Sequence, residues 1–293
     1  MLHAATAILV FTWTINGLVP HANNLSTTRR RITTTIRTSP TCSTTSSTST
    51  SLYGGYDATI GADPNTPIQV YCSEEKTPSD LCTFVCLAEL DLKYEIMSEL
   101  PNPVPDWFLR IHPDGTTPAL RNPVDKRLNN DIVCNTASET DKVNQYLCKV
   151  YQGATNKEEE DPTSSSCPLL PSNDEGMTTM ESIQRQIDET ILPACVSFLE
   201  NDDINNEAKY QAAAENALRL LFQSQTTAGH PFLIGSNLTL VDIYLFTHLK
   251  SIFLELNRSK KYILPSSTMG SMKSWHDACA SRPAFREVLS KQE

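Results

Sequence analysis

The chain has 293 residues, which is enough for two domains or for one domain with a long tail. Apolar residues make up 39% of it, an ordinary share for a protein with a hydrophobic core. The net charge is −10, and the first 56 residues hold four Arg and no acid, so the remaining body is more acidic still. Such a body is poorly suited to neutralising phosphates, and nucleic acid is therefore not an expected partner.

Nine cysteines are spread along the chain, and no two of them form a C-x-x-C pair. A zinc ribbon and a dithiol redox motif are therefore not supported, and no metal site is expected. A chain of this length also has no need of a disulfide framework. Free cysteines are often buried, so most of them are interpreted as small apolar core residues.

Residues 1–60 have the composition of a presequence. Ala4 to Val19 is an apolar run of signal-peptide length, and no stable membrane association of the mature protein is expected. Ser26 to Ser51 contains 18 Ser or Thr among 26 residues and is predicted to be disordered. This two-part pattern resembles that of plastid proteins imported through a secretory-type signal and a transit peptide. A secreted or endomembrane protein, with an O-glycosylated stalk or a single anchor, is the alternative.

The first folded unit, residues 61–150, begins as β-α-β. Ile68 to Tyr71 alternates as a short strand does, and Lys93 to Met97 predicts a second strand. Between them, Thr77 is a candidate N-cap and Pro78 follows at the first helical position, where its missing N–H costs nothing.

A helix, a tight turn and a strand follow from Trp107 to Leu120. Pro118 stands at the first position of that strand, so the backbone of Thr117 is left unpaired and available to a ligand. Ile132 and Val133 can form another edge strand, and a helix is predicted to begin at residues 138–140.

The remainder is read as an acidic linker and a helical domain. Residues 151–176 hold an acidic run, a Ser run and several prolines, and residues 177–293 hold helical apolar patterns. The first of these helices is expected to kink at Pro193. Thr239 and Asp242 have the spacing of an N-cap and the third residue of a later helix, a variant of the capping box.

These patterns together resemble the glutathione transferase superfamily, with the omega and dehydroascorbate-reductase-like branches the closest in pattern. Three stretches carry the resemblance: Trp107-Phe108 with Pro113-Asp-Gly115-Thr-Thr117-Pro118, Glu139-Thr140-Asp-Lys-Val143-Asn-Gln-Tyr146-Leu147, and Thr239 to Asp242 with Arg282-Pro-Ala-Phe285. The resemblance implies an α/β thioredoxin-like domain of mixed sheet, followed by an all-helical C-terminal domain.

The resemblance also implies where glutathione, as co-substrate, is bound. The Thr117 backbone before a cis Pro118 would pair with the cysteine of glutathione like an added strand. Glu139 and Thr140, at a helix start, would hold its γ-glutamyl end. Thr77 stands at the catalytic position, where free N–H groups and the helix dipole favour a thiolate. Ser79 is a second hydroxyl candidate.

The departure from the family lies at Thr77, where omega-type enzymes have Cys and several conjugating classes have Ser. A Thr hydroxyl can hydrogen-bond a thiolate but cannot form a mixed disulfide, which favours conjugation to an electrophile or peroxide reduction. Two alternatives stay open: a glutathione-dependent thiol or dehydroascorbate reductase that uses Cys82, and a non-catalytic binding or scaffold protein. The electrophile, a small molecule, would bind between the two domains, and the family pattern allows a homodimer.

Overall fold

Strand β1 (Ile68–Ser73) lies at the interior of a four-stranded sheet. Its side chains alternate between buried and half-buried, with Ile68, Val70 and Cys72 on the buried face. This is the two-residue period of a strand that rests one face on a core. The computed structural model describes residues 66–125, 128, 131–135, 141–151, 169–226, 229–264 and 266–290, and these pack as one unit.

The sheet has the order β2-β1-β3-β4. Strand β2 (Tyr94–Leu100) is parallel to β1, whereas β3 (Ala119–Arg121) is antiparallel to β1 and β4 (Ile132–Cys134) is antiparallel to β3. A right-handed crossover through one helix joins parallel neighbours, and short connections join antiparallel ones, so the β-α-β and β-β-α halves share one sheet. The mixed sheet predicted from the sequence is confirmed.

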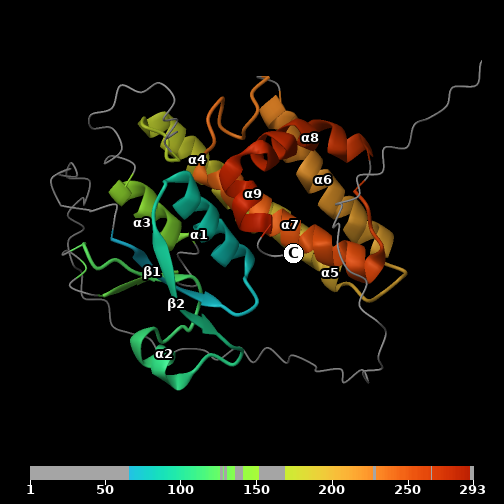
Figure 1. Cartoon of the computed structure of the whole chain (residues 1–293). Coiled ribbons are helices and arrows are strands. Elements are labelled where there is room, and N and C mark those ends of the chain that lie inside the picture. The colour runs from blue at the N-terminus through green and yellow to red at the C-terminus, as the bar shows by residue number, and fades with distance from the viewer. Residues whose placement is uncertain are drawn as a thin grey trace, which may run out of the picture. The chain divides into compact units, whose positions relative to one another are not determined.

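Three helices accompany the sheet (Figure 1). Helix α1 (Pro78–Glu89) connects β1 to β2 and packs against α3 (Lys142–Tyr151). Helix α2 (Asp106–Ile111) lies apart from both and covers a separate small apolar cluster through its buried Phe108, which contacts the ring of Tyr71. The strand and helix order in this part is that of a thioredoxin-like domain.

From residue 174 onward the described chain is helical. The elements are α4 (Asp174–Gln186), η2 (Ile187–Ile191), α5 (Leu192–Glu200), α6 (Glu207–Thr226), α7 (Leu240–Lys260), α8 (Ser266–Ser281) and α9 (Pro283–Ser290). Pro193, where a kink was predicted, follows a π-helical segment rather than ordinary α-helix. Because proline lacks an N–H and crowds the carbonyl four residues earlier, the turn before it has to adjust, and η2 is that adjustment.

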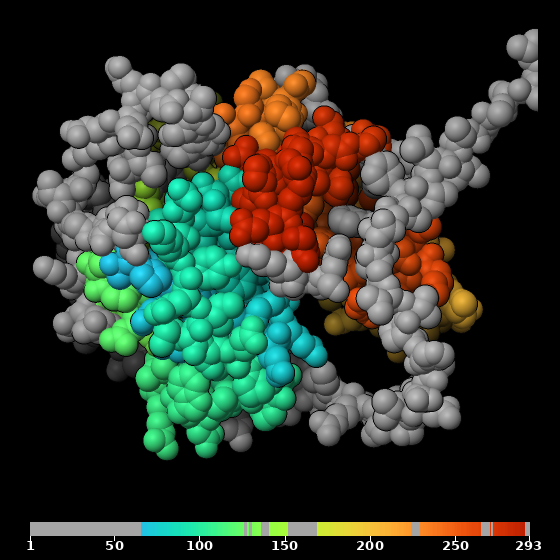
Figure 2. Space-filling model, in the orientation of Figure 1, coloured from blue at the N-terminus to red at the C-terminus, as the bar shows by residue number. Residues whose placement is uncertain are grey.

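One apolar core runs through both parts of the described chain, from β1 and α1 to α7 and α9. Helix α1 packs against α7 and α9, so the sheet part and the helical part share an apolar interface. Figure 2 shows the surfaces of α1 and α9 adjoining each other. The fold is thus a thioredoxin-like domain followed by an all-helical domain, as the sequence predicted.

Two predicted segments fall outside the described residues: the presequence at 1–60 and most of the linker at 151–176. The domain boundaries placed there stay predictions. Within the described ranges, no helix combines the length and the apolar character that crossing a bilayer requires.

Candidate functional site

The start of α1 is built as the sequence predicted. Thr77 has an extended backbone (φ −69°, ψ 162°) and serves as N-cap, and Pro78 occupies the first helical turn. The Thr77 hydroxyl accepts a hydrogen bond from the Asp80 amide at 3.1 Å, and the Thr77 amide donates to the Asp80 carboxylate at 2.9 Å. These two bonds form a reciprocal capping box, which satisfies two of the amides that a helix start leaves unpaired.

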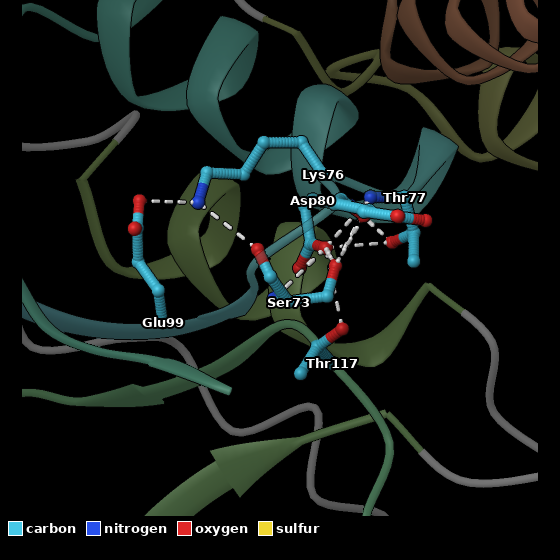
Figure 3. Close-up of polar contacts among 7 residues, drawn as sticks. Ser73, Lys76, Thr77, Asp80, Glu99 and Thr117 are labelled. Atoms are coloured by element: carbon cyan, nitrogen blue, oxygen red, sulfur yellow. Dashed lines mark hydrogen bonds and ion pairs between the residues drawn. The ribbon is translucent and has the colours of Figure 1, made fainter. Parts of the chain in front are cut away.

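The Asp80 carboxylate is the hub of the site (Figure 3). Its Oδ2 accepts the Thr77 hydroxyl at 2.8 Å and the Thr117 hydroxyl at 3.2 Å, and it also accepts the Ser73 hydroxyl. Asp80 is fully buried. A single carboxylate oxygen therefore ties together the end of β1, the start of α1 and the loop that enters β3.

The loop before β3 presents a free strand edge beside α1. The peptide bond between Thr117 and Pro118 is cis, as the family pattern implies. Pairing with β1 ends at Ala119, and the Thr117 main chain has no hydrogen-bond partner among the described residues. Its amide and carbonyl can therefore pair with an extended ligand.

A second set of contacts holds this loop in place. The Thr116 amide donates to His112 Nε2 at 3.1 Å, and the Thr116 hydroxyl lies 2.8 Å from the same nitrogen. The Thr116 hydroxyl donates to the Asn135 carbonyl at 2.7 Å, and the Asn135 side chain accepts the Val143 amide at 3.0 Å. The loop is thereby linked to the start of α3.

A basic side chain approaches the other side of the helix start. Lys76 donates to the Ser73 carbonyl at 2.9 Å and to Glu99 at 2.6 Å. It also approaches Cys72, where burial raises the pKa of the thiol while the Lys76 charge acts to lower it. Cys72 is buried on the core face of β1, so its thiol does not face a ligand at the helix start.

Cys82 does not have the surroundings of a catalytic thiol. It is fully buried, and burial raises its pKa. The Asn144 side-chain amide donates to its sulfur at 3.3 Å, from α3. A reactive thiol needs an exposed, electropositive position that favours the thiolate, and Cys82 has neither property. Its neighbour Cys86, one turn later, is buried in the same way.

The remaining predicted residues divide into described and undescribed ones. Ser79 is half-buried in the first turn of α1, and its hydroxyl has no hydrogen-bond partner among the described residues. Glu139 and Thr140 lie outside the described residues. The next residue, Asp141, is buried, and burial raises the pKa of its carboxyl to about 7.

A cavity of about 250 Å³ lies where α3 meets α4 and α7. Its lining includes Asp141, which directly precedes α3, Gln145 from α3, Gln184 from α4 and Asp188 from η2. This is the junction of the two domains, where the sequence prediction put the electrophile. The Tyr244 hydroxyl of α7 donates to Asp188 at 2.8 Å, close to this lining.

Asp80 is the residue that sequence reasoning missed. Its position three residues after Thr77 indicated an acid in the first turn, and the same spacing was recognised as a capping box at Thr239 and Asp242. Its contact with Thr117, 37 residues away, had no signal in the sequence. In the part of the chain that the structure covers, no cluster of three or more His, Cys, Asp or Glu could hold a metal ion.

Comparison with known proteins agrees with this architecture. Residues 187–283 match the family model of the glutathione S-transferase C-terminal domain. A curated relative, glutathione S-transferase DHAR2 of Arabidopsis thaliana, is 23% identical over 189 residues, which cover 64% of this chain and 72% of the relative.

Solved structures of similar fold include several glutathione transferases. The tau-class enzyme of mango, Mangifera indica, has a TM-score of 0.62 at 15% identity, covering 77% of this chain and 94% of the mango chain. The omega 3C enzyme of Trametes versicolor has a TM-score of 0.59 at 17% identity, covering 78% of this chain and 86% of the Trametes chain. The C-terminal family match, the curated relative and the fold together support membership of the glutathione S-transferase superfamily.

Proposed function

We propose that this protein is a glutathione-dependent enzyme that presents the glutathione thiol at the start of α1. The observation that carries the proposal is the meeting of two features at one carboxylate. The hydroxyl of Thr117, whose main chain is the free edge, and the hydroxyl of the N-cap Thr77 both donate to Asp80 Oδ2. A peptide paired to Thr117 would therefore have its central side chain next to the amides and dipole of the helix start.

The chemistry follows from the side chain at that position. Thr77 can donate a hydrogen bond to a thiolate but has no sulfur with which to form a mixed disulfide. Attack of the glutathione sulfur on a small electrophile, or on a peroxide oxygen, is the reaction that such a site supports. The similar solved structures and the curated relative carry the name glutathione transferase, which supports this class of substrate.

Burial disfavours the reductase alternative. A thiol without solvent access cannot attack a disulfide, and Cys82 is fully buried. The scaffold alternative keeps one supporting observation, because the hydrogen of the Thr77 hydroxyl is already donated to Asp80.

Two substitutions test the proposal on the full chain. Thr77→Cys introduces a thiol at the helix start, and we expect the variant to gain glutathione-dependent disulfide reduction that the wild type lacks. Cys82→Ser is the matched control, and we expect it to leave glutathione binding and conjugation unchanged. Failure of the wild type to bind immobilised glutathione would favour the scaffold. Loss of activity in Cys82→Ser alone, with the fold intact, would favour the reductase.

We further propose that residues 1–60 direct the protein to a plastid through a signal and a transit peptide. The apolar run from Ala4 to Val19 and the acid-free Ser/Thr-rich stretch after it support this assignment. A secreted or endomembrane protein is the alternative.

A further inference from the structure

Among the described helices, α1 and α7 begin with capping boxes of the same kind, and their carboxylates differ in how many oxygens accept hydrogen bonds. In α7, Asp242 Oδ2 accepts the Thr239 amide and hydroxyl at 2.9 and 2.7 Å. Its Oδ1 accepts the Leu233 amide at 2.8 Å and the Trp275 indole at 2.9 Å. Both oxygens of that carboxylate are satisfied, as a buried structural carboxylate requires.

In α1, only one oxygen of the Asp80 carboxylate is satisfied. Its Oδ2 collects all the hydrogen bonds described above, whereas Oδ1 is buried and has no partner among the described residues. A cap needs only the one oxygen. The Asp80 carboxylate is therefore left with one oxygen that no described donor neutralises, and its negative charge acts on a ligand bound at the start of α1.

The Thr77 hydroxyl has a single hydrogen, and it donates that hydrogen to the Asp80 carboxylate. The hydroxyl donates to Asp80 Oδ2 at 2.8 Å and accepts from the Asp80 amide at 3.1 Å. A hydroxyl stabilises a thiolate only by donating to it, so the sulfur of glutathione has to compete with a carboxylate for that hydrogen. The negative charge of Asp80 also opposes the formation of a thiolate nearby.

We infer that Asp80 is a positioning residue that limits the ionisation of the bound glutathione thiol. It keeps the Thr77 hydroxyl turned toward α1 and keeps the bound thiol protonated near neutral pH. This inference rests on the proposed function and deepens it, since it names the residue that sets how reactive the bound thiol is.

The test uses Asp80→Asn, which removes the charge while leaving an oxygen to cap the helix. The thiolate fraction of bound glutathione is titrated by its ultraviolet absorbance, and conjugation to an aryl halide is measured in parallel. We expect the variant to lower the pKa of the bound thiol by about one unit, which is about tenfold more thiolate at neutral pH. The rate of conjugation at saturating glutathione should rise with it, while glutathione affinity stays within about threefold.

Two further substitutions separate this role from a general loosening of the site. Thr77→Val in the Asp80→Asn background should reduce the gain to the part that comes from removing the charge, because the released hydroxyl is gone. Thr178→Ala in the same background removes an exposed hydroxyl on α4 that donates to the Asp174 carbonyl and does not contact Asp80, and the gain should persist. Circular dichroism checks folding, and Asp80→Ser replaces Asp80→Asn if the latter is unfolded.

The outcomes distinguish the inference from the function on which it rests. If the wild type binds glutathione and Asp80→Asn leaves the thiol pKa unchanged or raises it, the inference is overturned and the proposed function stands. A gain that Thr77→Val leaves undiminished also overturns it, because the hydroxyl would not be a group that Asp80 restrains. If the wild type binds no glutathione, both are overturned.

Discussion

Asp141 is the described carboxyl whose environment most clearly opposes its charge. It is buried at the start of α3, and its pKa is raised to about 7, chiefly by burial, although a hydrogen bond from Asn144 acts to lower it. The charge of Asp188, across the cavity, adds to the increase. Because the unfolded chain has the ordinary lower pKa, the folded state binds more protons between about pH 4 and 7.

The expected consequence is that the protein loses stability as pH rises through this window. Above pH 7 the folded state carries a buried carboxylate, a penalty on the order of 4 kcal/mol that is absent below pH 4. Asp141→Asn removes the titration, and its oxygen can still accept the Asn144 bond. Urea unfolding at pH 5 and pH 8 measures the free energy of unfolding of the wild type and of the variant. The stability of the variant relative to the wild type should be greater at pH 8 than at pH 5, and an equal difference at both would refute the assignment.

Individual residues also show how far the sequence alone could predict the site. The N-cap role of Thr77 could be predicted, because Thr followed by Pro and an acid is a local signal. The direction of its hydroxyl could not, since it depends on how the loop at Thr117 folds back over α1. Burial of Cys82 was favoured by residue type, whereas its Asn144 contact crosses 62 residues of chain.

At the scale of elements, the two capping boxes offer an internal comparison of stability. Replacing either carboxylate by an amide keeps one oxygen and turns the other into an NH₂ group. In Asp242→Asn that NH₂ faces two donors, the Leu233 amide and the Trp275 indole, which are left unpaired in the core. In Asp80→Asn it takes the place of Oδ1, which no described donor faces.

We therefore expect the two substitutions to differ in cost. Asp242→Asn should lower the free energy of unfolding by about 3 kcal/mol, and Asp80→Asn by about 1 kcal/mol or less. Urea denaturation followed by circular dichroism gives both values under the same conditions. Equal costs would show that Asp80 Oδ1 has a structural partner, and would weaken the case that its charge serves the site.

Most elements were predictable because their signals are local. Strand alternation at Ile68, the proline-led entry to β3 and the helix start at Thr239 each depend on a few adjacent residues, and each is confirmed. The π-helical form of η2 was not predicted. Proline signals that a helix must adjust, but which hydrogen bonds shift depends on the packing of Ile187 and Ile191 in the core.

At the scale of the whole described molecule, α1 is the element that belongs to both domains. Its start carries the candidate site, its middle packs against α7, and its last turn contacts the corner between α8 and α9. At that corner Arg282 forms a bidentate ion pair with Glu89, in which Nε donates to Oε1 at 2.7 Å and Nη2 donates to Oε2 at 2.6 Å. The Glu89 side chain is only 7% exposed, so the pair is largely removed from water.

This ion pair is expected to contribute more to stability than a surface pair. Breaking a buried pair on one side leaves an uncompensated charge, which costs far more than losing an exposed contact. Arg282→Ala should therefore lower the free energy of unfolding by on the order of 3 kcal/mol, and it should loosen the contact between α1 and α9. Urea denaturation measures the loss, and hydrogen exchange of the last turn of α1 locates it.

Arg286, four residues after Arg282 and on α9, is the matched control. It is exposed and donates to the Ser281 carbonyl, so Arg286→Ala should change stability by no more than about 0.5 kcal/mol. Glu89→Gln/Arg282→Met replaces both charges, and we expect it to recover part of the loss seen in Arg282→Ala, because no buried charge is left unpaired. If Arg282→Ala costs no more than Arg286→Ala, the two domains are held together by their shared apolar core alone.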